Sequence, residues 1–181
     1  MNPGPCYHDN FLSFMIWNSN SLAKNNFECV QLIEAYNSIF NYDLISLCET
    51  SLNNSTEIPD QLLNDYTFIP ANHPGDVSHG RVGLFYKTSL PLKPRNDLAF
   101  DESIIVELKF GRKKIFFTVL YRTPSVNHTS PEFETFLNNL KNIQAGKPFA
   151  SFYTEDFNGH SQSWWADTTP EGKNLKKCFP L

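Results

Sequence analysis

Short apolar runs and an amphipathic stretch alternate in the first part of the chain. Residues 11–18 (FLSFMIWN) and 43–50 (DLISLCET) are apolar runs ended by polar residues, a pattern typical of buried strands. Between them, residues 24–40 carry apolar side chains at spacings of three and four, which predicts an amphipathic helix. The buried face of this helix would consist of Phe27, Val30, Ile33, Tyr36 and Phe40. Strand, helix and strand in this order predict a crossover unit of an α/β protein.

The rest of the chain continues the α/β pattern. Residues 102–110 and 113–122 flank Gly111-Arg112 and predict a hairpin whose two strands are largely buried. Residues 130–143 open with Ser-Pro and place Phe133, Phe136, Leu137 and Leu140 on one face, which predicts a helix. We also expect strands at the start of 66–80, over 81–87 and over 148–154, and a loop with a helical turn over 53–63. These elements predict a mixed sheet covered on one face by helices.

Composition and charge narrow the class of protein. Hydrophobic residues make up 40% of the chain and aromatic residues 14%, enough for a packed core. No apolar run approaches the roughly 18 residues that cross a bilayer, so we expect no membrane partner. Scattered cysteines without a CxxC pair favour a reducing, intracellular compartment over a zinc site or disulfide framework, with Cys29 and Cys48 as small buried thiols. A net charge of −4 excludes a broadly basic nucleic-acid-binding surface, so any nucleic-acid contact must be local.

Polar side chains gather at the ends of four predicted strands. Strand ends and the loops after them are where α/β proteins place functional residues. A carboxylate that can hold a hard cation, amides that orient oxygens, a phenol and a second carboxylate suit metal-assisted hydrolysis of a phosphodiester. The residues at these ends are Asn18 and Asn20, then Glu49, then Tyr121 and Arg122, and finally Asp156 and Asn158.

Each of these features also has a purely structural interpretation. Residues 156–160 (DFNGH) alone are typical of a surface turn, and Tyr121 alone is typical of a packed strand aromatic. Residues 111–114 (GRKK) are typical of a solvated hairpin turn, with a DNA-contacting patch as the alternative. The combination at consecutive strand ends favours the catalytic interpretation over these separate ones.

Five blocks of sequence resemble a known family. WNSNSL, SLCET, GRVGLFYK, YRTPS and DFNGHSQSWW stand in the order seen in the endonuclease/exonuclease/phosphatase superfamily. The chain looks most like the endonuclease domain of LINE-type non-LTR retrotransposons. This resemblance implies a DNase I-like four-layer α/β sandwich and Mg²⁺-dependent (or Mn²⁺-dependent) nicking of DNA. It also implies a reverse transcriptase domain in the same polypeptide and, if the chain is active, a location in the nucleus.

The resemblance assigns roles to individual residues. Glu49 would be the principal metal ligand, with Asn20 near the metal. Asn18, Asp156 and Asn158 would orient the nucleophilic water and the phosphate, and Tyr121 would contact the scissile phosphate. Arg122 and His160 flank the motifs and would contact DNA.

Two departures from the family pattern change these expectations. Family members end this domain with a Ser-Asp-His segment, and none of the five histidines here stands in such a context. We therefore expect residues 1–10 to be an N-terminal extension and residues 11–181 to be the domain without its C-terminal part, so that the second sheet is incomplete. Glu155 stands where the family has Gly, and its charge would repel DNA or favour protonation of Asp156.

These departures predict that activity is weak or absent. They leave two rival interpretations of the chain. One is another phosphoesterase of the same superfamily. The other is a non-catalytic remnant or a domesticated module that binds DNA or protein.

Overall fold

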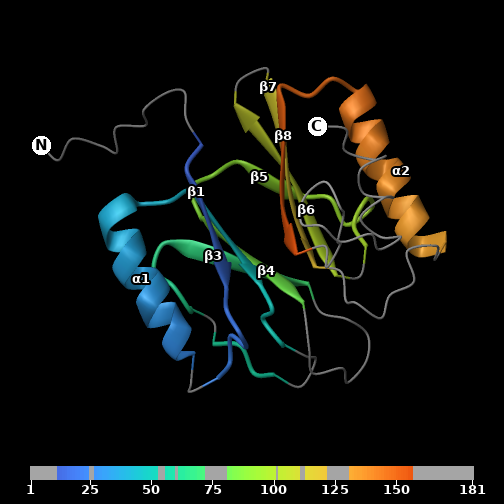
Figure 1. The fold of residues 1–181 in the computed structure, drawn as a ribbon. Helices are drawn as coiled ribbons and strands as arrows, with labels where there is room; N and C mark the ends of the chain where they lie inside the picture. Colours follow the sequence, from blue (N-terminus) through green and yellow to red (C-terminus); the bar gives the residue numbers. More distant parts are fainter. Residues whose placement is uncertain are drawn as a thin grey trace, which may run out of the picture.

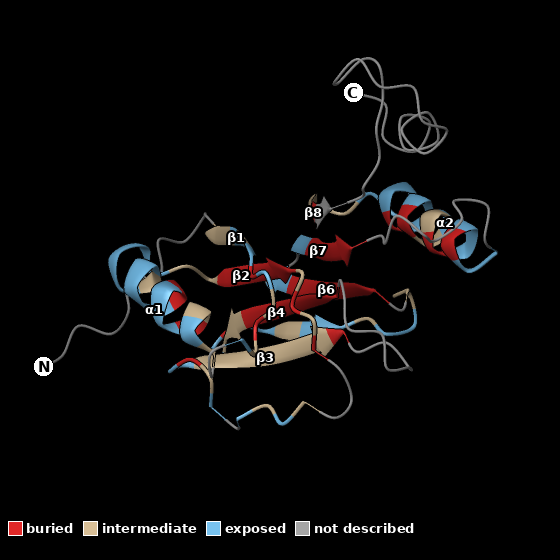
Figure 2. Ribbon diagram, turned by 60° about the horizontal axis from the view of Figure 1, so that its bottom comes forward, coloured by how far each residue is buried: buried red, intermediate tan, exposed pale blue. Residues whose placement is uncertain are grey.

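The computed structural model places two stacked β-sheets between two helices (Figure 1). Within the described part of the chain, the central strands of both sheets are largely buried, the edge strands are mostly intermediate, and the outer faces of the helices are exposed (Figure 2). The predicted N-terminal extension, residues 1–10, lies outside the described residues. The model describes residues 12–24, 27–52, 56–59, 61–71, 81–100, 102–110, 113–121 and 131–156.

The first sheet contains the predicted crossover unit. Strand β1 (Phe14–Asn18) runs parallel to β2 (Leu44–Cys48), and helix α1 (Glu28–Phe40) connects them. β4 (Val82–Lys87) pairs antiparallel with both β2 and β3 (Tyr66–Ala71), which gives the order β1-β2-β4-β3.

The second sheet has the same number of described strands. β6 (Ser103–Phe110) and β7 (Lys113–Tyr121) form the predicted hairpin, and β5 (Leu92–Pro94) pairs with β6 at one edge. β8 (Ala150–Asp156) runs parallel to β7 after helix α2 (Pro131–Ala145). Within the described residues β8 pairs only with β7, as expected for an incomplete second sheet.

The strands do not form the one mixed sheet predicted from the order of elements. They form two sheets, and each sheet has a helix on its outer face, because the central strands are apolar on both faces. In β7, Phe116 and Leu120 pack with α2, whereas Phe117 and Val119 pack toward the first sheet. The resulting layers are α1, first sheet, second sheet and α2, so the four-layer sandwich implied by the family resemblance is confirmed.

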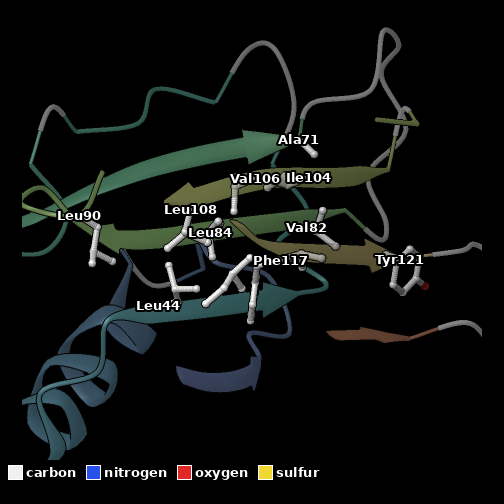
Figure 3. Packing of buried hydrophobic residues seen from close by; sticks show 12 residues of the cluster. Leu44, Ala71, Val82, Leu84, Leu90, Ile104, Val106, Leu108, Phe117 and Tyr121 are labelled. Carbon is white, nitrogen blue, oxygen red and sulfur yellow. The ribbon is translucent and has the colours of Figure 1, made fainter. Parts of the chain in front are cut away.

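Aromatic contacts tie the two sheets together. The ring of Phe14 in β1 lies 5.3 Å from that of Phe117 and 5.4 Å from that of Phe152 in β8. Figure 3 shows the core between the two sheets, where Leu44 and Leu84 of the first sheet pack with Phe117 of the second. Phe117 is completely buried. Stacked sheets of this kind bury the inner face of every strand in one continuous core.

The helices differ in how well the sequence pattern predicted their buried faces. In α1, Val30 and Ile33 are buried, but Tyr36 is 47% exposed and Phe40 is 58% exposed. Tyr36 packs on Trp17 of the edge strand β1, and Phe40 is the last residue of the helix, so both lie at the margin of the sheet. In α2, Phe133, Phe136 and Leu140 are buried, Leu137 is partly buried, and Ile143 adds a further turn to the face.

The two cysteines differ as well. Cys48 is buried as predicted, whereas Cys29 is only partly buried, and among the described residues neither forms a disulfide. Burial raises the pKa of the Cys29 thiol above its ordinary value. No helix among the described residues is long and apolar enough to cross a membrane.

Gly83 in β4 is required by a close packing contact. An added Cβ atom would lie 2.7 Å from two ring atoms of Phe68, whose ring packs on Phe85 at a centroid distance of 4.6 Å. Gly83→Ala is therefore expected to lower the free energy of unfolding by about 1–3 kcal/mol, measured by urea denaturation. In a Phe68→Leu background the same change should cost less, because the ring is gone. Equal costs in both backgrounds would contradict this explanation.

Candidate functional site

Two parallel strand pairs, one in each sheet, end in the polar residues that the sequence singled out. In the first pair, Asn18 is the last residue of β1 and lies opposite Cys48, so Glu49 follows directly beside it. In the second pair, Tyr121 ends β7 opposite Asp156, the last residue of β8. The backbone therefore brings Asn18 next to Glu49 in one sheet and Tyr121 next to Asp156 in the other.

All four strands of these pairs run in the same direction (Figures 1 and 3). Phe14, Phe117 and Phe152, which contact one another across the sheets, stand four residues before the ends of β1, β7 and β8. At roughly 3.3 Å per residue, each strand advances about 13 Å from this aromatic contact to its last residue. The strand ends therefore come to the same end of the sandwich. We call Asn18, Asn20, Glu49, Tyr121 and Asp156 the strand-end site.

Backbone hydrogen bonds join the loop after β1 to Glu49. The carbonyl oxygen of Glu49 accepts hydrogen bonds from the backbone N–H of Ser21 (2.8 Å) and from the Ser19 hydroxyl (3.1 Å). The Oδ1 atom of Asn18 accepts from the backbone N–H of Asn20 at 3.0 Å. These hydrogen bonds fix the main chain of Glu49 through its carbonyl oxygen and do not involve its carboxylate group.

The same loops hold several residues in the left-handed backbone region. Asn20, Ser21, Glu49 and Ser51 have φ angles of 44°, 77°, 53° and 51°. For residues with a side chain this region costs roughly 1–2 kcal/mol each. Such strain persists where the surrounding structure imposes it, and it concentrates at functional sites.

Tyr121 occupies a different environment from the exposed amides. Its side chain is 8% exposed and belongs to the core between the sheets (Figure 3). Its backbone N–H donates to the carbonyl oxygen of Glu102 at 3.0 Å. Asp156 is described through its backbone, and Arg122, Asn158 and His160 lie outside the described residues.

Sequence reasoning missed two buried charged residues at this end of the sandwich. Arg81 is completely buried and stands just before β4, where its carbonyl oxygen accepts from the backbone N–H of Thr50. Glu102 is 6% exposed and precedes β6, beside Tyr121. Charged side chains are rarely this buried unless their surroundings compensate the charge. The signal in the sequence was a charged residue directly before an apolar strand, which is also typical of a surface strand end.

The donor set in the described part of the site fits a hard cation. Glu49 offers one carboxylate, and Asn20, in the loop that is hydrogen-bonded to the Glu49 backbone, offers an amide oxygen, whereas the amide oxygen of Asn18 already accepts the Asn20 backbone N–H. Mg²⁺ takes one or two carboxylates and keeps several waters. No group of three or more His, Cys, Asp or Glu side chains gathers among the described residues, so this part of the chain holds no zinc-type cluster.

Comparison with solved structures confirms the fold. The chain is similar to the endonuclease domain of TRAS1, a telomere-specific non-LTR retrotransposon (13% identity, TM-score 0.63, 91% of this chain and 69% of that one). It is also similar to the AP endonuclease LMAP from Leishmania major (14%, TM-score 0.70, 92% and 61%). A third similar structure is truncated TDP2 from Caenorhabditis elegans (18%, TM-score 0.57, 88% and 66%).

These three structures are members of the endonuclease/exonuclease/phosphatase superfamily. The chain therefore has the DNase I-like fold, and it spans about two thirds of the length of these proteins. No protein-family model and no curated protein matches the sequence.

Proposed function

We propose that this chain is a Mg²⁺-dependent phosphodiester hydrolase that nicks DNA, the endonuclease domain of a retrotransposon-derived protein with a reverse transcriptase in the same polypeptide. The observation that supports it is the meeting of two parallel strand pairs at one end of the sandwich. One pair brings Asn18, Asn20 and Glu49, and the other brings Tyr121 and Asp156. The ordered sequence blocks favour the retrotransposon assignment, and the fold, which the TRAS1 domain shares with LMAP and TDP2, is compatible with it.

Glu49 is the residue that would hold the metal ion, Mg²⁺ or Mn²⁺, with Asn20 beside it. The bound ion would offset the negative charge that develops on the phosphoryl and leaving oxygens. Glu49 suits this role because its carbonyl oxygen is already used by Ser19 and Ser21, so the loop is fixed without its carboxylate.

Asn18 is oriented to donate a hydrogen bond. Because its Oδ1 atom accepts from the Asn20 backbone, its Nδ2 group is the part that can reach a phosphate oxygen or a water. An amide donor serves this purpose without adding negative charge next to a phosphate.

The remaining residues act on the water and the phosphate. Asp156 would align the attacking water and accept its proton, and Asn158 would position that water. Tyr121 would donate a hydrogen bond from its phenol to an oxygen of the scissile phosphate, and Arg122 and His160 would contact the DNA. The protein would act on DNA and, as the resemblance implies, in the nucleus.

Nicking of supercoiled plasmid tests the proposal. The purified chain is expected to convert supercoiled plasmid to the open-circular form only slowly with Mg²⁺ or Mn²⁺, because Glu155 adds a negative charge beside the site, and to lose this weak activity in EDTA. A chain that is folded by circular dichroism and leaves the plasmid intact would overturn the catalytic proposal in favour of a DNA- or protein-binding module. Hydrolysis of a small phosphomonoester in place of the plasmid would instead indicate another phosphoesterase.

A further inference from the structure

A groove of about 640 Å³ lies at the end of the second sheet away from the strand-end site. It is bordered by the start of β7, the last turn of α2 and the segment that leads into β8. Strand β7 connects the two sites, because its first residue, Lys113, lines the groove and its last residue, Tyr121, belongs to the strand-end site. At roughly 3.3 Å per residue the two sites are about 26 Å apart along the strand. We call this feature the basic groove.

The charge of the basic groove is opposite to that of the whole chain. Its lining includes the cations Arg95, Lys113, Lys114 and Lys147 and one carboxylate, Glu107, in a chain of net charge −4. A concave surface with this excess of positive charge attracts anions.

The one carboxylate of the groove is already engaged. Arg95 lies 3.1 Å and Lys114 3.5 Å from the two carboxylate oxygens of Glu107. Arg95 also holds Asp97 at 2.7 Å, and this hydrogen-bonded contact lowers the pKa of the Asp97 carboxyl below its ordinary value. Within the described residues neither Lys113 nor Lys147 takes part in an ion pair. These two ammonium groups are therefore available to an external anion.

An exposed aromatic ring stands among these cations. Phe149 is 61% exposed, although its backbone N–H is fixed to the carbonyl oxygen of Lys114 at 2.9 Å. The Nζ atom of Lys113 lies 4.0 Å from the centre of the Phe149 ring. An exposed ring with a lysine ammonium group over it is an arrangement in which a base can stack on the ring while the neighbouring phosphate meets the lysine.

We propose that the basic groove binds a single-stranded segment of nucleic acid, with a base stacked on Phe149 and phosphates on Lys113 and Lys147. A single strand fits better than a duplex, because the base faces of a duplex are covered by their neighbours. The sequence left the segment GRKK between a solvated turn and a DNA contact. Its last two residues, Lys113 and Lys114, line this groove, and residues 111–112 lie outside the described residues. The site needs neither the metal ion nor the strand-end site.

Fluorescence anisotropy of a labelled oligothymidylate in EDTA tests the proposal with the full chain and without cleavage. A duplex of the same length, an oligouridylate and inorganic polyphosphate serve as comparison ligands. The variants are Lys113→Glu combined with Lys147→Glu, and Phe149→Leu alone. Lys141→Glu is the matched control, because Lys141 is exposed on the same helix as the groove-lining Asn139 and Asn142 but does not line the groove.

The chain is expected to bind single strands more tightly than the duplex. The double charge reversal should weaken binding at low salt by more than about tenfold and reduce the slope of log affinity against log salt by about 1.4. Phe149→Leu should weaken binding by about fivefold or more, and Lys141→Glu should not change it. Equal binding of the oligothymidylate by both groove variants and the control would overturn the proposal. So would polyphosphate or duplex binding as tight as that of the single strand.

These measurements also distinguish the groove proposal from the catalytic proposal, and binding of RNA from binding of DNA. Plasmid nicking by the groove variants is measured separately. A groove that does not bind single strands therefore leaves the catalytic proposal unaffected, and a chain that does not nick plasmid can still be tested for binding in the groove. Tighter binding of oligouridylate than oligothymidylate would assign the groove to RNA, and the reverse would assign it to DNA. Both results support a single-strand site.

Discussion

Glu49→Gln is expected to lower the rate of metal-dependent plasmid nicking by at least about 100-fold. Glutamine keeps the shape of the side chain and the loop hydrogen bonds to the Glu49 backbone, but it removes the charge that would hold the metal ion. Loss of one group that stabilises charge in the transition state typically costs this much. Initial nicking rates over a series of Mg²⁺ concentrations measure the effect, and raised Mg²⁺ should restore part of the rate.

The matched control is Glu34→Gln, since Glu34 is exposed on α1 and its loss should leave the rate unchanged. Glu49→Gly provides a second, independent readout. Its φ of 53° favours glycine, so the variant should be as stable as the parent chain or up to about 1 kcal/mol more stable while inactive. An active Glu49→Gln chain would remove Glu49 from the site.

Phe117→Ala is expected to lower the free energy of unfolding by about 3–5 kcal/mol. Phe117 is completely buried, and its ring contacts Phe14 of the first sheet and Phe152 of the neighbouring strand, so its loss leaves a cavity between the layers. Natural domains are stable by only about 5–15 kcal/mol, so this one change removes a large share. Urea denaturation followed by circular dichroism measures it.

A graded pair of variants makes this stability test specific. Phe117→Leu keeps most of the volume and should cost less than about 1.5 kcal/mol. Ile39→Ala removes an apolar side chain that is 73% exposed and should change stability by less than about 0.5 kcal/mol. A loss for Phe117→Ala no larger than that for Ile39→Ala would mean that the sheets are not held together through this ring.

Local patterns predicted the elements, because the signals for them lie in neighbouring residues. The run LISLC of β2, the hairpin of β6 and β7, and the spacing in α2 each contain their own evidence. β5 was missed because Leu92-Lys93-Pro94 has no apolar run, and its strand form depends on pairing with β6. The division into two sheets was also missed from the residues alone. A strand apolar on both faces suits a single covered sheet and a stacked pair equally well.

In the site, too, the positions of residues at strand ends could be predicted from neighbouring residues, whereas burial of charged side chains could not. The sequence predicted polar residues at the ends of four strands, and the register places two of these ends side by side in each sheet, Asn18 opposite Cys48 and Tyr121 opposite Asp156. The catalytic roles of these residues stay a prediction. Arg81 and Glu102 were missed because a charged residue directly before an apolar strand is also typical of a surface strand end, and whether its charge is buried depends on the strands that surround it.

The strand-end site has no strand common to its two halves. Asn18, Asn20 and Glu49 belong to one sheet and the loops after its strands, and Tyr121 and Asp156 belong to the other. Among the described residues no backbone ladder joins these two halves. In that part of the chain, side-chain packing between the layers, centred on Phe14, Phe117 and Phe152, sets how the halves face each other. Hydrogen-bonded ladders resist sliding along their length, whereas stacked apolar faces permit small shear. The distance across the site is therefore its softest dimension, and it is the one that a bound phosphate and cation would fix.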